Sequence, residues 1–158
     1  MFLRALTAFL LLPGVAALAL PPLLAAFDPW QGAMQWSGVF VIVPGITLLL
    51  WCVRDFYVSG KGTLAPWDPP KNLVVVGLYR LVRNPMYLSV LTLAAGWTIM
   101  FASPVLAAYT AALAAGFHLR VLLHEEPWLE SKFGGEWQRY RLEVSRWRPR
   151  ISPWRGDT

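Results

Sequence analysis

Long apolar runs separated by short polar segments dominate the pattern of this chain. The runs do not show the strict alternation of a barrel strand, so they predict helices. The longer runs reach the roughly 20 residues that a helix needs to cross a hydrocarbon core. The four runs are residues 2–27, 36–57, 86–101 and 104–123.

The third and fourth runs are short and close together. Only Ala102 and Ser103 separate them, and Pro104 suits the first turn of a following helix. These two runs therefore predict a tight helical hairpin, tilted or incompletely spanning. The predicted fold is all-α and integral to the membrane, with two spanning helices plus a C-terminal hairpin, about four membrane segments in all.

Composition supports this prediction. The chain has 158 residues, of which 56% are hydrophobic, and its mean hydropathy is +0.46. These values are too apolar for an ordinary soluble domain of that length. We expect one membrane domain over residues 1–158.

Basic residues predict the orientation. All fourteen Lys and Arg lie at Arg4, within residues 54–83, or from Arg120 onward. The positive-inside rule then places both termini and the central loop in the cytoplasm. The net charge of +5 needs no nucleic acid as an explanation, because a basic face also attracts anionic lipid headgroups.

The first run has one alternative interpretation. Arg4 precedes an apolar stretch with Ala-rich sites, as in a cleaved signal peptide, but the run is long and lacks a polar cleavage region. Either interpretation leaves the second span running from outside to inside. The single cysteine, Cys52, lies inside a span and excludes an internal disulfide.

Polar residues gather at the start of the third run, in GLYRLVRNPMY at residues 77–87. Asn84 and Pro85 predict the N-cap and first residue of the helix, and residues 79–83 predict one or two helical turns before it. A helix start with unpaired N–H groups favours a carboxylate or phosphate, and Arg80 and Arg83 strengthen that field. Contact of these arginines with lipid headgroups is the alternative.

Tyr79 and Tyr87 add aromatic faces, which attract cations at close range. A ligand that carries both a carboxylate and a cation would suit this mixture. The alternative is that both tyrosines belong to an aromatic belt at the membrane surface.

A second polar cluster, HEEPWLESKFGGEWQRY at residues 124–140, follows the fourth run. Glu125 and Glu126 are adjacent carboxylates at a membrane exit, where they must be paired or functional. Ion pairs with Arg80, Arg83 or Arg120 are the structural alternative. Pro127 is expected to disrupt the helix at this point.

Beyond Pro127, apolar residues three or four positions apart predict two short amphipathic helices with a bend at Gly134 and Gly135. These helices anchor at the membrane surface, and they can also roof a pocket formed by the first cluster.

Several chemistries find no support in the sequence. His118 and His124 lie on different helix faces, and HEEPW is not a metal-binding HExxH, so no metal site is predicted. The chain has no Gly-rich phosphate loop and no nucleophilic Ser or Cys with a matching base.

These motifs resemble the isoprenylcysteine carboxyl methyltransferase and phospholipid methyltransferase superfamily of integral membrane enzymes. The similarity runs over residues 60–151, in NLVVVGLYRLVRNPMY, EEPWLESKFGGEWQRY and a late RPRI. It implies a methyltransferase that uses S-adenosylmethionine, with residues 1–59 as N-terminal spans and residues 60–158 as the catalytic core. It implies a lipophilic small molecule or lipidated substrate as the methyl acceptor.

The resemblance also implies site residues. Glu125 would position the cofactor, Tyr87 would line the sulfonium site, and Arg120 would orient the acceptor. The expected cofactor contacts are Lys71, Asn72, Leu73, Val74, Tyr79, Asn84, Pro85, Met86, Tyr87 and Glu125.

The chain departs from the carboxyl methyltransferases at three positions. Those enzymes typically have His where this chain has Lys71 and Asn84, and an arginine where it has Val121, with Arg120 one residue away. The acceptor therefore stays open between isoprenylated cysteine, a phospholipid amine, a small thiol and another lipophilic acid.

Two other functions remain. Residues 125–151 also look like the C-terminal end of membrane sterol reductases, which use NADPH but are much larger. The third hypothesis is a catalytically silent membrane module that keeps the fold.

Overall fold

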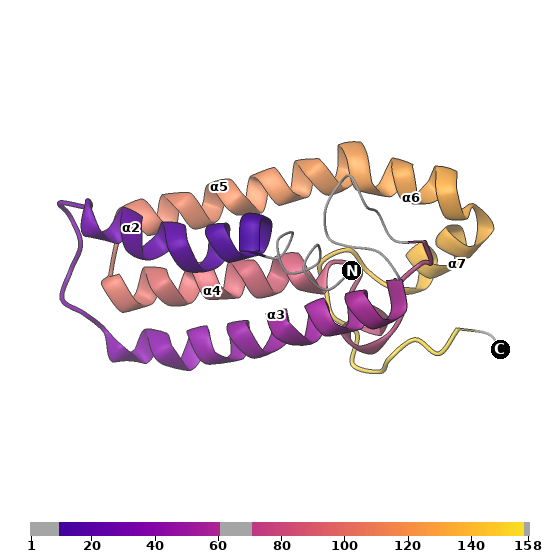
Figure 1. Ribbon diagram of the computed structural model, residues 1–158, viewed down its shortest axis with the longest axis horizontal. Helices are drawn as coiled ribbons and strands as arrows, with labels where there is room; N and C mark the ends of the chain where they lie inside the picture. The colour runs from indigo at the N-terminus through magenta and orange to yellow at the C-terminus, as the bar shows by residue number, and fades with distance from the viewer. Residues whose placement is uncertain (1–9, 61–70, 157–158) are drawn as a thin grey trace.

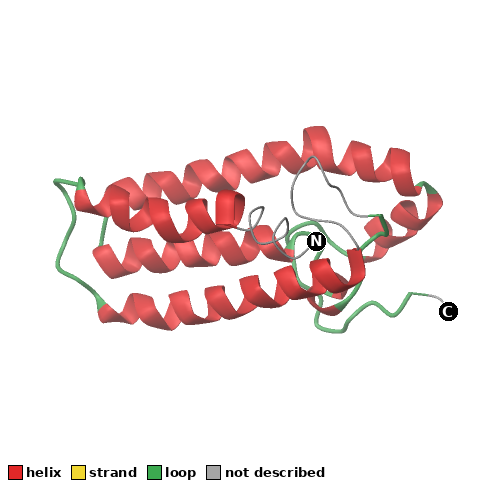
Figure 2. Cartoon of the chain, in the orientation of Figure 1, coloured by secondary structure: helices red, strands yellow, loops and turns green. Residues whose placement is uncertain are grey.

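The computed structural model describes residues 10–60 and 71–156, and every regular element in these two ranges is helical (Figure 2). Long helices lie side by side along the molecule, and the short elements within residues 77–80 and 126–143 gather at one end (Figure 1). The elements in chain order are the π-helix η1 (Leu10–Ala19), α2 (Leu20–Ala26), the 3₁₀ turn η2 (Trp36–Gly38), α3 (Val39–Gly60), the 3₁₀ turn η3 (Gly77–Arg80), α4 (Pro85–Phe101), α5 (Pro104–Arg120), the π-helix η4 (Val121–Glu125), α6 (Glu126–Phe133) and α7 (Gly135–Glu143).

The helix α4 is the centre of the bundle. It packs against α3 on one side and α5 on another, and η1 and α2 also contact it. Small residues allow the close approach of α3: a Cβ on Gly96 would lie 2.7 Å from Cγ1 of Ile42. Leu49, Val90 and Leu93 are almost fully buried in the core beside this crossing.

Two helices are long and apolar enough to cross a membrane, namely Trp36–Phe56 and the continuous helix Pro104–Phe133. Gly14–Ala26 and Pro85–Phe101 are shorter apolar helices. These helices match the four predicted runs in position, but the fourth run, which was predicted to be short, is part of the long helix Pro104–Phe133. The start of the first run, residues 1–9, lies outside the described residues, and so does the proposed signal-peptide start.

The predicted hairpin between α4 and α5 is present. Ala102 ends α4 in the left-handed conformation with φ of 43°, and Ser103 is the N-cap of α5, accepting from the backbone N–H of Leu106 at 3.1 Å. Pro104 occupies the first turn, where its missing N–H costs nothing.

Asp28 fastens this hairpin to the end of α2. Its carboxylate accepts from the Ser103 hydroxyl and from the backbone N–H groups of Trp30 at 2.9 Å and Val105 at 3.3 Å. The hydrogen bond from Ser103, helped by the two backbone donors, lowers the pKa of the Asp28 carboxyl below its ordinary value.

The predicted helix break at Pro127 is wrong. The helix that starts at Pro104 continues through the π-helix η4 into α6. Proline lacks an N–H and its ring crowds the carbonyl four residues back, here that of Leu123. A π turn bonds to the fifth residue back instead of the fourth, so the wider turn accommodates Pro127 without ending the helix.

The segment before α4 is less helical than predicted. Residues 73–75 have no regular secondary structure, and a single 3₁₀ turn at Gly77–Arg80 replaces the expected helical turns of residues 79–83. Residues 61–70 of the Gly- and Pro-rich loop lie outside the described residues.

The bend between the two short C-terminal helices is where the sequence places it. Gly134 has φ of +51° and separates α6 from α7. Residues 144–154, here called the C-terminal strap, then return to the segment before α4. The strap is fixed there by backbone hydrogen bonds from Arg83 to Ser145, from Arg150 to Leu81 and from Trp154 to Arg80.

Candidate functional site

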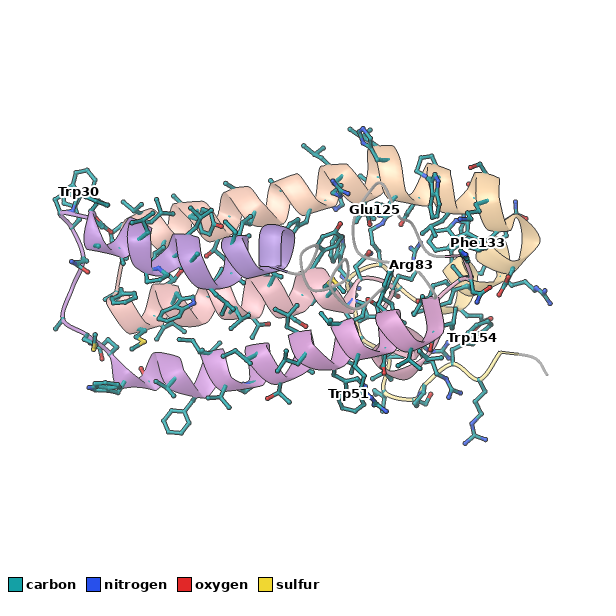
Figure 3. The ribbon with its side chains drawn as sticks, in the orientation of Figure 1. Trp30, Trp51, Arg83, Glu125, Phe133 and Trp154 are labelled. Atoms are coloured by element: carbon teal, nitrogen blue, oxygen red, sulfur yellow. The ribbon has the colours of Figure 1, made fainter. Side chains whose placement is uncertain are left out.

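A cavity of about 420 Å³ lies where the short elements meet the helix bundle. Arg83 and Glu125, which both line it, lie at the end of the molecule opposite Trp30 (Figure 3). Its walls come from η1, α3, residues 72–87, α4 and α7. The long helix that consists of α5, η4 and α6 completes them. The lining residues are Ala16, Phe56, Asn72, Leu73, Val74, Tyr79, Arg83, Asn84, Met86, Tyr87, Val90, Phe117, Arg120, Val121, Glu125, Glu126, Trp128, Leu129, Trp137 and Tyr140.

The cavity is apolar toward the bundle and charged toward the short elements. Ala16, Phe56, Val90 and Phe117 come from the apolar helices. The charged side chains come from the segment before α4 and from the junction of α5, η4 and α6. An amphipathic cavity of this size suits a small molecule with a few polar groups.

Glu125 shares its carboxylate between two donors from different elements. The Tyr87 hydroxyl donates to Oε1 of Glu125, and Nε of Arg120 donates to the same oxygen at 2.9 Å. Arg120 Nε also lies 3.2 Å from the Tyr87 oxygen. The ring of Phe117 stacks on Tyr87 with centroids 4.4 Å apart, which holds the phenol in place.

Glu126 makes a separate and more buried set of contacts. Its Oε1 accepts from Arg83 Nη1 at 2.9 Å and from Arg146 Nε at 2.6 Å, and its Oε2 accepts from Arg146 Nη2 at 2.7 Å. Burial lowers the pKa of the Arg83 guanidinium and Glu126 opposes this, while hydrogen bonding to Glu126 raises the pKa of Arg146. This cluster is the structural ion pair that the sequence left open.

Two donors on the cavity residues have no partner within the described part of the chain. They are Nε of Arg83 and Nε1 of Trp137, both buried. The Arg83 guanidinium lies over the Trp137 ring at 5.4 Å, so the two groups share one wall.

Tyr79 and Tyr140 form the wall behind the cavity. The Tyr140 hydroxyl donates to the carbonyl of Tyr79 at 2.6 Å, linking α7 to η3. Burial raises the pKa of both phenols well above the ordinary value, so both stay protonated.

Asn84 occupies the predicted N-cap position of α4, but its side chain does not cap the helix. Its amide donates instead to the carbonyl of Arg146 at 3.3 Å. The residue therefore joins the start of α4 to the C-terminal strap.

Nine of the eleven residues predicted for the site line the cavity. Lys71 is exposed and Pro85 is buried in the first turn of α4, and neither is part of the lining. The roles given to these two residues stay predictions. The nine that come together are Asn72, Leu73, Val74, Tyr79, Asn84, Met86, Tyr87, Arg120 and Glu125.

Other lining residues were missed from the sequence. The amphipathic stripe, which predicted helices able to roof a pocket, was the signal for Trp128, Leu129, Trp137 and Tyr140. No local signal marks Ala16, which reaches the cavity only through the packing of η1 on α4.

The comparisons with known proteins give one match. No curated protein and no solved structure matches the chain. The family described as phospholipid methyltransferase matches residues 33–136, more than half of the chain. The matched residues include the first polar cluster and most of the second, and they end at Glu136 in the first turn of α7, before the C-terminal strap. This chain therefore belongs to the phospholipid methyltransferase family, a family of membrane methyltransferases.

Proposed function

We propose that the protein is an integral membrane methyltransferase that uses S-adenosylmethionine to methylate a lipophilic acceptor, in the manner of the isoprenylcysteine carboxyl methyltransferases. One observation carries the proposal: the Tyr87, Arg120 and Glu125 group lies in the wall of a cavity that is apolar toward the helix bundle. A polar cofactor and an apolar acceptor can meet there.

The described residues fit the cofactor, which is both cationic and anionic. Glu125 offers a carboxylate to its positive groups, and Tyr87, Phe117 and Trp128 offer aromatic faces to a sulfonium. The unpartnered donors of Arg83 and Trp137 suit oxygen acceptors. When bound, S-adenosylmethionine supplies an electrophilic methyl group.

The chain itself has little acid–base work to do for a carboxylate or thiolate acceptor. Its residues hold the acceptor in line with the methyl group and exclude water. Arg120 is half-exposed at the cavity wall and suits an acceptor carboxylate. Glu125 fixes Arg120 and Tyr87 in one arrangement, which limits the reorganisation needed on binding.

The bundle end that holds the cavity carries the basic residues of the described ranges, which supports a cytoplasmic site and cytoplasmic termini. Four membrane segments, with residues 1–59 as spans and residues 60–158 as the catalytic core, complete the proposal. A protease-cleavable tag after Thr158 in sealed vesicles tests the orientation. Cleavage only by a protease on the non-cytoplasmic side of the membrane would contradict it.

Calorimetry with detergent-purified protein tests the cofactor. Wild type is expected to bind S-adenosylmethionine and S-adenosylhomocysteine, and Glu125→Ala is expected to bind both much more weakly. NADPH is the matched control ligand. Binding of NADPH alone would favour the reductase, and no binding of any of the three by folded protein would favour the silent module.

A further inference from the structure

The C-terminal strap lies beyond the residues that match the family, yet it joins the two polar clusters of the site. The carbonyl of Ser145 accepts from the N–H of Arg83 at 3.0 Å, and the carbonyl of Arg146 accepts from the side chain of Asn84 at 3.3 Å. The backbone of residues 145–146 is therefore fixed to the start of α4.

The side chain of Arg146 reaches the second cluster from this position. Its guanidinium donates through Nε and Nη2 to the two oxygens of Glu126, at 2.6 and 2.7 Å. Glu126 keeps 14% of its side chain exposed, and Arg146 keeps 27%. A two-pronged contact of this kind fixes the orientation of a carboxylate as well as its position.

Glu125 and Glu126 are neighbours in the chain, and both line the cavity. Adjacent carboxylates of like charge compete for the same cations. The structure separates them: Arg83 and Arg146 hold Glu126, whereas Tyr87 and Arg120 hold Glu125. Glu126 is also the first residue after the π-helix η4, whose last residue is Glu125.

We propose that Arg146 is a positioning residue of the methyltransferase site. By fixing Glu126, it holds the end of η4 in the orientation that keeps Glu125 on Tyr87 and Arg120. Arg146 does not line the cavity, so it acts through the two glutamates and not by touching the ligand. This inference rests on the proposed function, because it assigns Arg146 a role within the same methyltransferase site.

Binding of S-adenosylhomocysteine, measured by calorimetry, tests the proposal. Arg146→Ala is expected to weaken binding about tenfold, the range of coupling within a connected ion-pair network. Arg146→Lys keeps the positive charge but lacks the paired N–H donors of the guanidinium, and it is expected to recover part of the affinity. Arg148→Ala is the matched control, since Arg148 is an exposed arginine of the same strap.

A double-mutant cycle separates positioning from other roles. In a Glu125→Gln background, Arg146→Ala is expected to have little further effect, because the carboxylate that it orients is gone. An undiminished tenfold effect in that background would mean that Arg146 acts independently of Glu125, and would overturn the proposal. Equal affinities of Arg146→Ala and Arg148→Ala would overturn it as well.

The same measurements distinguish this inference from the proposed function. Wild type that binds S-adenosylhomocysteine while Arg146→Ala binds equally well leaves the function standing and removes the positioning role. Folded wild type that does not bind removes both. Thermal melting of each variant shows whether it is folded, and Arg146→Lys supplies the result if Arg146→Ala does not fold.

Discussion

The two ends of the helix bundle pair their carboxylates in opposite ways. At the end near Trp30, Asp28 is 4% exposed and accepts from a hydroxyl and two backbone N–H groups, all neutral. At the other end, Glu125 and Glu126 lie in the wall of a cavity and pair directly with arginines. The first arrangement fastens a hairpin, whereas the second keeps charges beside an open volume where a ligand can reach them. The difference indicates which end is built for stability and which for chemistry.

The largest effect is expected where the two ends are joined, at the crossing of α3 and α4. Gly96→Leu has no room, since even a Cβ would lie 2.9 Å from the backbone nitrogen of Ile42. We expect a loss of more than about 3 kcal/mol in unfolding free energy. Thermal melting in detergent measures it. A fold that keeps its melting temperature would show that this crossing does not hold the bundle together.

Glu125→Ala is expected to show that the cavity end serves ligand binding more than stability. It removes a charged acceptor from Tyr87 and Arg120, so the affinity for S-adenosylhomocysteine should fall roughly 10- to 100-fold. The melting temperature should change little, because Glu125 keeps 31% of its side chain exposed. Tyr87→Phe keeps the ring on Phe117 and serves as the matched variant with a smaller loss. Unchanged affinity in both would contradict the assignment of this end.

Ser103→Ala is the counterpart at the other end. It removes the N-cap of α5 and the hydroxyl donor to Asp28. We expect a loss of about 1 kcal/mol in unfolding free energy and no change in cofactor affinity. Chemical denaturation and calorimetry on one preparation measure both quantities. A fall in affinity would show that the two ends are coupled through α4 and α5.

The smallest effect is expected on the melting temperature when the pH is lowered. The pKa of Asp28 is lower in the folded protein than its ordinary value of 3.8, so its charged form stabilises the fold above that value. This contribution is lost as the pH falls below 3.8 and through the lower folded pKa. Melting temperatures measured over this range should therefore fall less steeply for Asp28→Asn than for wild type. Equal slopes would mean that Asp28 does not contribute.

The sequence predicted the helices well because their signal is local. The positions of α3, α4, α5 and the bend at Gly134 follow from apolar runs and from Pro and Gly at fixed places. Pro127 misled the prediction, since its effect on a helix depends on whether the turn before it can widen.

The site was predictable where its residues lie within one of the two sequence motifs. Tyr87 and Glu125 were both expected in the site, and the structure joins them by a hydrogen bond. Arg146 was not expected, because its partner Glu126 lies 20 residues away and several arginines compete for that role in the sequence. Only the path of the C-terminal strap selects among them.

The π-helix at Val121–Glu125 sets the rotational phase between the long apolar helix and the roof of the cavity. If the same residues formed an ordinary α-helix, everything after them would rotate by about 100°, the angle of one residue. Trp128 and Leu129 would then turn away from the cavity that they now line. Removing one residue from the wide turn would instead restore an α-helix and leave the orientation of Trp128 and Leu129 nearly unchanged. The match between the wide turn and the number of residues in it is therefore as strict a requirement of the site as the identity of its side chains.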